Sequence, residues 1–388
     1  SAGLGATDHP LLGAAVELPD SDGFLFTGRL SLATHPWLAD HAVMGSVLLP
    51  GTAFVELALR AGDQVGCDRV DELTLEAPLV LPEHTAVQLR LSVGAADQAG
   101  RRALALHSRT EGADTELPWT RHATGTLATG AEHALQALTA WPPAGAEQVA
   151  VEGLYEGLAD AGFGYGPVFR GLRAAWRRGE EVFAEVSLGE DVDPGPARFT
   201  LHPALLDAVL HAVGLGSLVE DTGQGRLPFA WSGVAVHAVG ADTLRVRLSR
   251  AGKDAVALEI ADAEGVPVAS VRSLALRTFS PDQLSGTRSG HGDALFRVEW
   301  SVVSVGGSAG VVDDWLVLGE GSQAFADLAM LRAVAAEGGV VPGVVVVPCS
   351  APEGAGVPGA VHAGSARVLS LLQEWLADGR FDGSRLVF

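Results

Sequence analysis

The predicted order of elements repeats in this chain, and that repetition constrains the fold more than any other feature. The first half contains short alternating strands in FLFTGRLSL, VDELTLEAPLVL, AVQLRLSV and ALALHSRT, interrupted early by an apolar helix over residues 51–62. The second half contains an apolar helix over residues 202–215, followed by strands in GVAVHAV, TLRVRLS, AVALEIAD and VASVRSLALRTF. Alternation of apolar and polar residues is typical of strands with one buried face. One helix with a run of antiparallel strands, present twice, predicts a duplicated α+β unit in which each helix lies on a curved sheet.

The same patterns divide the chain into four segments. Residues 1–140 and 141–282 carry the two repeats, with the Pro/Ala/Gly-rich stretch ALTAWPPAGAEQ at their junction, and residues 283–295 form a polar, glycine-rich linker. In residues 296–388 the strands WLVLG, GVVVVP and RLVF are continuously apolar and alternate with helical patterns in SQAFADLAMLRAVAAEG and AVHAGSARVLSLLQEWLADG. This order predicts a parallel sheet with crossover helices, a partial α/β Rossmann-like unit. Both ends look cut from a longer polypeptide, because the chain starts without methionine and stops within a predicted strand.

Composition excludes several classes of function. The 388 residues carry a formal net charge of −21 at pH 7, which argues against nucleic acid and anionic membranes as partners. No apolar run reaches the roughly 18 residues that a membrane-spanning helix needs. The two cysteines, Cys67 and Cys349, lie far apart in the sequence. This usage favours a reduced, cytoplasmic protein and excludes a disulfide framework or a thiolate zinc site.

The helical pattern over residues 201–218 carries a carboxyl group where almost every neighbour is apolar. Before Ser217 its strongly polar side chains are His202, Asp207 and His211. A buried carboxylate without a partner costs several kcal/mol. His211 is the expected partner, because residues i and i+4 share a helix face, whereas His202 points elsewhere. Taken alone, the pair fits a structural Asp–His contact as well as a catalytic one.

An imidazole in the first half changes this interpretation. His41 lies in HPWLADHAVMGSVLLPG, an otherwise mostly apolar segment just before the first helix. If the two halves pair about a pseudo-twofold axis, His41 and Asp207 face each other across one slot. A neutral histidine is a competent base near pH 7, and a carboxyl group among leucines tends to keep its proton and to act as an acid. Such a pair suits an elimination, in which one group takes a proton from carbon and the other protonates a departing hydroxyl.

Two other classes of function stay open at this point. His41, Asp207 and His211 also match the two-histidine, one-carboxylate ligand set of a metal-dependent hydrolase, which a chelator would inactivate. A catalytically silent dimerisation scaffold is the other class: its side chains would pack as in an enzyme, but it would turn over no substrate. The sequence GGSAG at 306–310 matches GxSxG, but a strand pattern rather than a helix follows it, so we interpret it as a loop.

Four motifs together indicate a family. HAVMGSVLLP fits HxxxGxxxxP with His41, Gly45 and Pro50, and DAVLH fits DxxxQ/H with Asp207 and His211. HPALL precedes the second motif, and YGPVF and LPFAW stand before and after it. In this order and spacing the motifs resemble the dehydratase domain of a modular type I polyketide synthase. The resemblance implies a double hotdog fold, two tandem units that each wrap an antiparallel sheet on a helix.

The resemblance also implies roles for individual residues. His41 would remove the α-proton of a 3-hydroxyacyl thioester, Asp207 would protonate the β-hydroxyl, and water would leave to give a 2-enoyl thioester. His211 would orient Asp207, and Tyr165 would hydrogen-bond near the leaving hydroxyl. The segment around Gly45 and the start of the following helix would present backbone N–H groups to the thioester carbonyl. The acyl tunnel would be lined by Leu227, Pro228 and Phe229.

The resemblance to a dehydratase domain covers roughly residues 8–280, and a second resemblance covers the rest. Residues 296–388 resemble the structural, non-catalytic first half of a polyketide ketoreductase domain. There GEGSQA fits the GxGxxA pattern of a dinucleotide site, but the acidic residue that reads the ribose is missing. We therefore interpret this segment as scaffold, and we expect the chain to bind no cofactor and no metal of its own.

Partners follow from the resemblance as well. An acyl carrier protein would deliver the substrate on its phosphopantetheine arm, and ketoreductase, ketosynthase and acyltransferase domains of the same synthase would be neighbours. A homodimer is expected from the family. In FRGLRAAWRRG the residues Arg170, Arg173 and Arg177 form a basic stripe if the segment is helical. On so acidic a chain the stripe would dock an acidic carrier protein, unless it is only solvated surface.

Overall fold

The computed structural model describes residues 5–19, 21–113, 118–130, 137–189, 192, 196–220, 225–278, 314–319, 324–349 and 357–388. The chain divides into two units, Ser1–Arg297 and Val298–Phe388, and each is described by itself. The predicted linker at 283–295 and the GGSAG loop at 306–310 lie outside the described residues, as does most of GEGSQA, at 320–323.

The first half of unit 1 is an antiparallel sheet wrapped around helix α1 (Gly51–Gln64). Its strands pair in the order β1-β2-β3-β7-β8-β9-β6. Strand β7 shows why the alternating pattern predicts this arrangement: Val87, Leu89 and Leu91 are buried, whereas Arg90 between them is exposed. The strands are β1 (Gly5–His9), β2 (Leu12–Leu18), β3 (Gly23–Leu30), β6 (Arg69–Leu75), β7 (Val87–Ala96), β8 (Arg102–Thr110) and β9 (Thr120–Ala128).

The second half repeats the topology of the first around helix α3 (Pro203–His211). Its strands pair in the order β14-β17-β16-β15-β13-β12-β10. We match β10, β12 and β13 to β1, β2 and β3, and β14 to β17 to β6 to β9. The order of the second half, read from its far end, is then the same as the order of the first half. The strands are β10 (Glu147–Val149), β12 (Leu172–Arg178), β13 (Glu181–Ser187), β14 (Arg226–Val236), β15 (Thr243–Gly252), β16 (Ala255–Ala261) and β17 (Pro267–Thr278).

The two halves join through equivalent strands into one sheet of fourteen strands within the described residues. Strand β6 pairs antiparallel with β14, with Leu73 opposite Trp231 and Val70 opposite Val234. Antiparallel pairing of equivalent strands creates a local pseudo-twofold relation between the halves. The predicted duplication and the double hotdog fold are confirmed.

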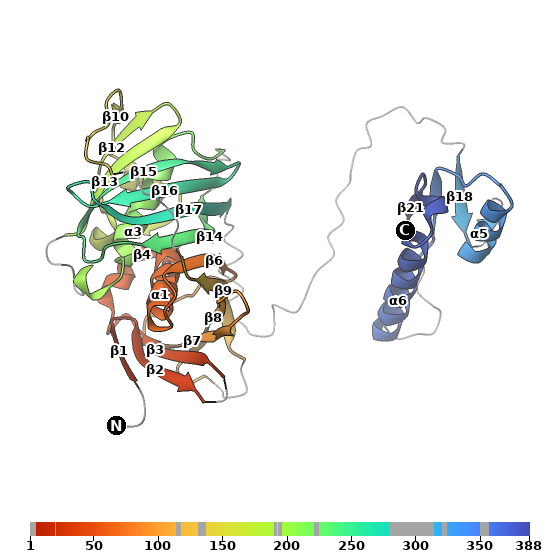
Figure 1. The fold of residues 1–388 in the computed structure, drawn as a ribbon, viewed down its shortest axis with the longest axis horizontal. Helices are drawn as coiled ribbons and strands as arrows, with labels where there is room; N and C mark the ends of the chain where they lie inside the picture. The colour runs from red at the N-terminus through yellow and green to blue at the C-terminus, as the bar shows by residue number, and fades with distance from the viewer. Residues whose placement is uncertain are drawn as a thin grey trace. The chain divides into compact units, whose positions relative to one another are not determined.

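Each central helix is covered by its own half of the sheet, as Figure 1 shows. Helix α1 contacts β6, β9 and β14, and α3 contacts β12 and β13. Every residue of α1 from Thr52 to Leu59 is buried, which explains why the helix is apolar nearly all round. The helices also contact each other, and the Thr52 hydroxyl donates to the carbonyl oxygen of Pro203 at 2.9 Å.

A small second sheet links the two halves beside these helices. Strand β4 (His41–Val43) pairs with β5 (Ser46–Val47) on one side and with β11 (Phe163–Tyr165) on the other. Strand β11 belongs to the second half and follows the short helix α2 (Leu154–Asp160). The connection brings the HxxxGxxxxP and YGPVF motifs together.

Unit 2 has the predicted β-α-β-α-β order with a parallel sheet, β19-β18-β20-β21. The helix predicted over 322–338 starts later than expected, because residues 324 and 325 form a strand and Asp327 caps the helix by accepting from the Met330 N–H at 2.9 Å. The elements are β18 (Trp315–Leu318), β19 (Ala324–Phe325), α5 (Leu328–Ala336), β20 (Val344–Val346), α6 (Val357–Leu376) and β21 (Arg385–Val387).

The conditional helix over 169–179 is not formed. Residues Leu172–Arg178 are strand β12, held between β13 and β10. Arg173 and Arg177 both lie on this strand and are exposed, and the pairing with β13 has a register shift between Leu172 and Ala174. Within the part of the chain that the structure describes, no helix combines the length and apolarity needed to cross a membrane.

Candidate active site

His41 is buried at the start of β4, with 5% of its surface exposed. Its Nδ1 lies 2.9 Å from the carbonyl oxygen of Leu48. Because a carbonyl oxygen only accepts, the neutral ring carries its proton on Nδ1 and keeps a lone pair on Nε2. Burial lowers the pKa of His41, and the nearby Asp207 opposes that shift only in part. The result is a neutral imidazole whose basic nitrogen is oriented by the backbone.

A tight turn next to His41 explains the glycine of the first motif. Strands β4 and β5 are joined by Met44 and Gly45, whose φ angles are 50° and 76°. Positive φ at both positions is the geometry of a two-residue type I′ hairpin, which favours glycine because glycine lacks Cβ. The turn returns the chain so that the Leu48 N–H donates to the carbonyl oxygen of His41 at 3.1 Å.

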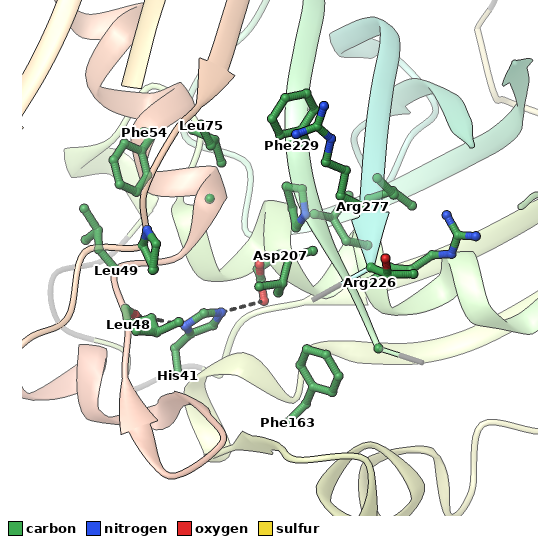
Figure 2. Close-up of a pocket in the computed structure, with 18 of the residues that line it drawn as sticks. His41, Leu48, Leu49, Phe54, Leu75, Phe163, Asp207, Arg226, Phe229 and Arg277 are labelled. Carbon is green, nitrogen blue, oxygen red and sulfur yellow. Dashed lines mark hydrogen bonds and ion pairs between the residues drawn. The ribbon is translucent and has the colours of Figure 1, made fainter. Parts of the chain in front are cut away.

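Asp207 and His211 extend from α3 towards the same point. His211 Nε2 lies 3.3 Å from Asp207 Oδ2, as the i, i+4 spacing predicts. Asp207 Oδ2 also lies 3.8 Å from His41 Nε2, as Figure 2 shows. The Asp207 and His211 side chains are 6% and 4% exposed. Within the described residues, Asp207 Oδ2 and His211 Nε2 are buried without a fully formed hydrogen bond. Buried polar atoms in this condition are suited to receive a polar group of a ligand.

Tyr165 reaches the site from β11. It is the cross-strand partner of His41, and the two ring centroids are 5.6 Å apart. Its ring also lies 4.2 Å from that of His211. Burial raises the pKa of Tyr165 well above its ordinary value, so the hydroxyl keeps its proton and can donate a hydrogen bond.

Asp40 is a residue of this site that the sequence analysis missed. Its backbone carbonyl accepts from the Gly166 N–H at 2.8 Å, and its side-chain Oδ2 accepts from the Val168 N–H at 2.9 Å. Both bonds tie the segment that carries Tyr165 to the residue before His41. An acidic residue next to a motif histidine is the only signal in the sequence, and it does not identify a partner 128 residues away.

Tyr155 was also missed. Its hydroxyl lies 3.4 Å from His211 Nδ1, and the Leu172 N–H donates to it at 3.0 Å. The chain contains only two tyrosines, Tyr155 and Tyr165, and their ring centroids are 6.4 Å apart. Because the sequence has so few tyrosines, their presence in one short stretch of the sequence could have indicated that both belong to the site.

A cavity of about 1840 Å³ opens onto these groups. His41, Tyr165, Asp207 and His211 line it, and so do the three residues expected for the tunnel, Leu227, Pro228 and Phe229. Figure 2 shows Leu48, Leu49, Phe54 and Leu75 around the side of the cavity next to His41.

The start of α1 lies at the wall of this cavity. Pro50 is the N-cap of the helix, and Gly51, its first residue, lines the cavity, whereas Gly45 does not. A Cβ at Gly51 would lie 3.1 Å from Leu75 Cδ1 and 3.2 Å from Pro228 Cβ. Glycine therefore keeps the slot open where the helix begins.

The arginines of the expected docking stripe lie on the surface. All three are exposed, and none of them lines the cavity. Arg170 donates from Nε to the carbonyl oxygen of Tyr165 at 2.8 Å, and Arg173 on β12 donates from Nε to the Ser187 hydroxyl at 2.8 Å. Arg177 lies four residues further along the same strand.

The ligand set of a metal-dependent hydrolase is not assembled. Among the residues that the structure describes, no three His, Cys, Asp or Glu side chains are grouped so as to hold a metal ion. A neutral base and a carboxyl group in one largely apolar cavity instead suit proton removal from carbon coupled to protonation of a leaving group.

Family models match most of the chain. Residues 9–109 match the polyketide synthase dehydratase domain, and residues 133–286 match the polyketide synthase dehydratase N-terminal domain. Residues 298–388 match the Rossmann fold domain of the polyketide synthase extender module SpnB.

Curated relatives are long synthases of which this chain corresponds to a small part. The chain is 55% identical over 398 residues to polyketide synthase GfsA of Streptomyces halstedii, a match that covers 99% of this chain and 5% of that protein. It is 50% identical over 405 residues to the pikromycin synthase component PikAII of Streptomyces venezuelae, with 100% of this chain and 11% of that protein covered.

This chain also matches solved structures of similar sequence, and each match covers nearly the whole length of the solved chain. A structure from work on dehydratase substrate selection for the borrelidin and fluvirucin polyketide synthases has a TM-score of 0.68 and 52% identity, and the match covers 72% of this chain and 98% of that one. The erythromycin dehydratase has a TM-score of 0.65 and 45% identity, with 71% and 98% covered.

Proposed function

The chain belongs to the family of polyketide synthase dehydratase domains, and on that premise we propose that His41 is its catalytic base and Asp207 its catalytic acid. Its reaction is the dehydration of a hydroxyacyl thioester to an enoyl thioester during polyketide chain processing. The observation that carries the two assignments is the distance of 3.8 Å between His41 Nε2 and Asp207 Oδ2 in one buried cavity.

The proposed reaction is an elimination across the Cα–Cβ bond of a 3-hydroxyacyl thioester. His41 Nε2 takes the α-proton, and the electron pair of that C–H bond forms the new double bond. The Cβ–O bond breaks as Asp207 gives its proton to the hydroxyl, which leaves as water. The imidazolium and carboxylate that remain attract each other at short range, and transfer of the proton back resets both groups.

The other residues of the motifs support this step in different ways. We assign His211 to orient Asp207 and Tyr165 to hydrogen-bond the leaving hydroxyl, because its proton is retained at neutral pH. The free N–H groups at the start of α1, beginning with Gly51, are suited to the thioester carbonyl, where negative charge develops when the α-proton leaves. Gly45 and Pro50 act through the backbone, by closing the β4–β5 turn and by starting the helix.

The substrate is held in the cavity that these groups line. We propose that Leu227, Pro228 and Phe229 form part of the acyl tunnel, which their position in the wall supports. Dehydratase domains of this family need no cofactor of their own. We propose that the substrate arrives on the phosphopantetheine arm of an acyl carrier protein.

Partners are proposed from the relatives, which are multidomain synthases. Ketoreductase, ketosynthase and acyltransferase domains would be neighbours, and the active form would be a homodimer. Arg170, Arg173 and Arg177 stay the proposed contact for the acidic carrier protein, now as exposed side chains along and beside a strand. Reversal of the charge at Arg173 tests this contact: it should raise the KM for the carrier-bound substrate and leave the KM for a pantetheine substrate unchanged.

The proposed domain boundaries are 1–140 and 141–282 for the hotdog units, 283–295 for the linker and 296–388 for the ketoreductase-like structural segment. The match of the last segment to a Rossmann fold domain supports its Rossmann-like fold, and we propose that it is a scaffold because the acidic residue that reads the ribose is missing. We propose that the protein is located in the cytoplasm, and its two free cysteines support this location.

The test is turnover of a 3-hydroxyacyl thioester on its carrier protein, with loss or gain of one water followed by mass spectrometry. His41→Ala and Asp207→Asn should each lower turnover by about 10² to 10⁴, and circular dichroism should show both variants folded. EDTA should have no effect, whereas inactivation by EDTA would favour the hydrolase alternative. Absence of turnover with either hydroxyl configuration at several chain lengths would favour a silent scaffold.

A further inference from the structure

Tyr155, on α2, has no role in the motifs or in the reaction above, although it contacts His211, the neighbour of the proposed acid. Its ring meets that of His211 edge-on, with the centroids 5.5 Å apart. Its hydroxyl is within hydrogen-bond distance of one nitrogen of His211, and the other nitrogen of the same ring faces Asp207. The contacts of this hydroxyl therefore decide what His211 offers to Asp207.

The hydroxyl has one fixed and one adjustable partner. The Leu172 N–H donates to the Tyr155 oxygen at 3.0 Å, and this bond has a single direction because a backbone N–H only donates. Burial raises the pKa of Tyr155, so the hydroxyl keeps its proton at neutral pH. That proton needs an acceptor, and His211 Nδ1 lies 3.4 Å from the oxygen.

The tautomer of His211 follows from this arrangement. If Nδ1 accepts from Tyr155, the neutral ring carries its proton on Nε2. Nε2 is the atom that lies 3.3 Å from Asp207 Oδ2. His211 then turns an N–H group towards Asp207 Oδ2, although these two atoms do not have the geometry of a complete hydrogen bond. The opposite tautomer would leave the Tyr155 proton without this acceptor and would turn a lone pair towards the carboxyl group.

We propose that Tyr155 is a positioning residue that holds the proton of His211 on Nε2 and so fixes which oxygen of Asp207 acts as the acid. The proposal rests on the proposed role of Asp207. An N–H group that faces Oδ2 favours Oδ1 as the oxygen that carries the proton to the leaving hydroxyl. The same donor stabilises the carboxylate that remains after the proton has left.

His41 belongs to the same array but receives its tautomer from a different source. Its Nδ1 is tied to the carbonyl oxygen of Leu48, so the base has a bare Nε2. His211 is tied to a hydroxyl donor, so it has a protonated Nε2. One imidazole is thus prepared to take a proton and the other to donate a hydrogen bond, although both Nε2 atoms lie within 4 Å of Asp207 Oδ2.

The direct test reads the tautomer of His211 in the ligand-free protein. Long-range ¹H–¹⁵N spectra of the ¹⁵N-histidine-labelled chain distinguish the two neutral tautomers, and the His211→Gln variant identifies the signal. We expect the proton on Nε2 in the parent and a mixed or reversed tautomer in Tyr155→Phe. A parent protein with its proton on His211 Nδ1 overturns the proposal, whether or not the variant folds.

The second tyrosine supplies a matched control. Tyr165→Phe removes a hydroxyl from the same site but leaves the contact between Tyr155 and His211 in place. It should lower turnover without changing the tautomer of His211. If Tyr165→Phe changes that tautomer as much as Tyr155→Phe does, Tyr155 has no special position and the proposal is wrong.

Kinetics then connect the tautomer to the reaction. Tyr155→Phe should lower kcat about tenfold or more, as expected when an orienting histidine loses its correct tautomer, and should leave KM within about twofold, because phenylalanine keeps the ring. An unchanged kcat in a variant with an altered tautomer overturns the proposal. Failure of the proposed function looks different: the parent would show no dehydration while His211 still carried its proton on Nε2.

Discussion

Tyr165 lies directly opposite His41 in the antiparallel pairing of β11 with β4, so one strand register joins the base from the first half of the fold to the tyrosine from the second. A shift of this register by one residue would turn Tyr165 to the other face of the small sheet. The bonds that hold the register are therefore part of the catalytic geometry. Asp40 supplies two of them, through its carbonyl oxygen and its carboxylate.

Removal of the Asp40 side chain should make the position of Tyr165 less fixed, although Asp40 bonds to Val168 and not to the Tyr165 side chain. Asp40→Ala leaves the Val168 N–H without its carboxylate acceptor, and we expect a loss of about 1–3 kcal/mol in the free energy of unfolding, together with a several-fold lower kcat. Asp40→Asn keeps an acceptor oxygen and should retain most of both. Urea unfolding and turnover measure the two effects. If the Asp40→Ala protein is destabilised but fully active, the bond from Asp40 to Val168 is not needed for the catalytic geometry.

The pH dependence of activity should reflect the lowered pKa of His41. The base is active in its neutral form, and a lowered pKa keeps that form populated at more acidic pH. The value of kcat/KM should therefore fall on the acid side with a midpoint below about 6.5, the ordinary value for histidine. A profile from pH 5 to 8, with a carrier-independent pantetheine substrate, measures this midpoint. A midpoint above 6.5 would contradict the proposed neutral, desolvated base.

The repeated order of elements and the central pair of the site could be predicted because both leave local signals. A lone carboxyl group in an apolar helix and an imidazole in an apolar loop are visible in short windows of sequence. Their meeting followed from the duplication, since equivalent strands β6 and β14 pair about a pseudo-twofold relation.

The remaining parts of the site could not be predicted, because they depend on partners far away in the sequence. Asp40 meets Val168 across 128 residues, and Tyr155 meets His211 across 56. The strand β12 was missed for a related reason: the arginine spacing there favours a helix, and the segment is a strand because it pairs with β13 and β10.

Glu56 offers a test of how the halves are held together. Its carboxylate is buried on α1 and accepts from the Thr200 and Leu201 N–H groups, each at 2.8 Å, just before α3 begins. His9 Nε2 lies 3.0 Å from the same group. Because Glu56→Ala leaves the Thr200 and Leu201 N–H groups without an acceptor, we expect a loss of about 1–3 kcal/mol in the free energy of unfolding for each group.

The matched control for Glu56 lies on the same helix. Asp63 pairs with Arg60 at 3.1 Å, but its side chain is 73% exposed, so Asp63→Ala should change stability by no more than about 0.5 kcal/mol. Urea unfolding followed by circular dichroism compares both variants with the parent. Equal stability of Glu56→Ala and Asp63→Ala would show that the buried carboxylate does not hold the start of α3.

Gly51 should tolerate no side chain if the start of α1 receives the thioester carbonyl. In Gly51→Ala the new Cβ would crowd Leu75 and Pro228 at 3.1 and 3.2 Å and would occupy the slot, while the backbone N–H stays in place. Alanine is favoured over glycine within a helix, so stability should change little while KM for the thioester rises and kcat falls. Thermal unfolding and steady-state kinetics measure the two separately.

Gly45→Ala is the control variant. Nothing lies within 4 Å of its Cβ, but φ is 76°, so the substitution should cost about 1 kcal/mol of stability. It should affect KM less than Gly51→Ala does. The reverse pattern, with Gly45→Ala raising KM more than Gly51→Ala, would move the carbonyl site from the helix start to the turn.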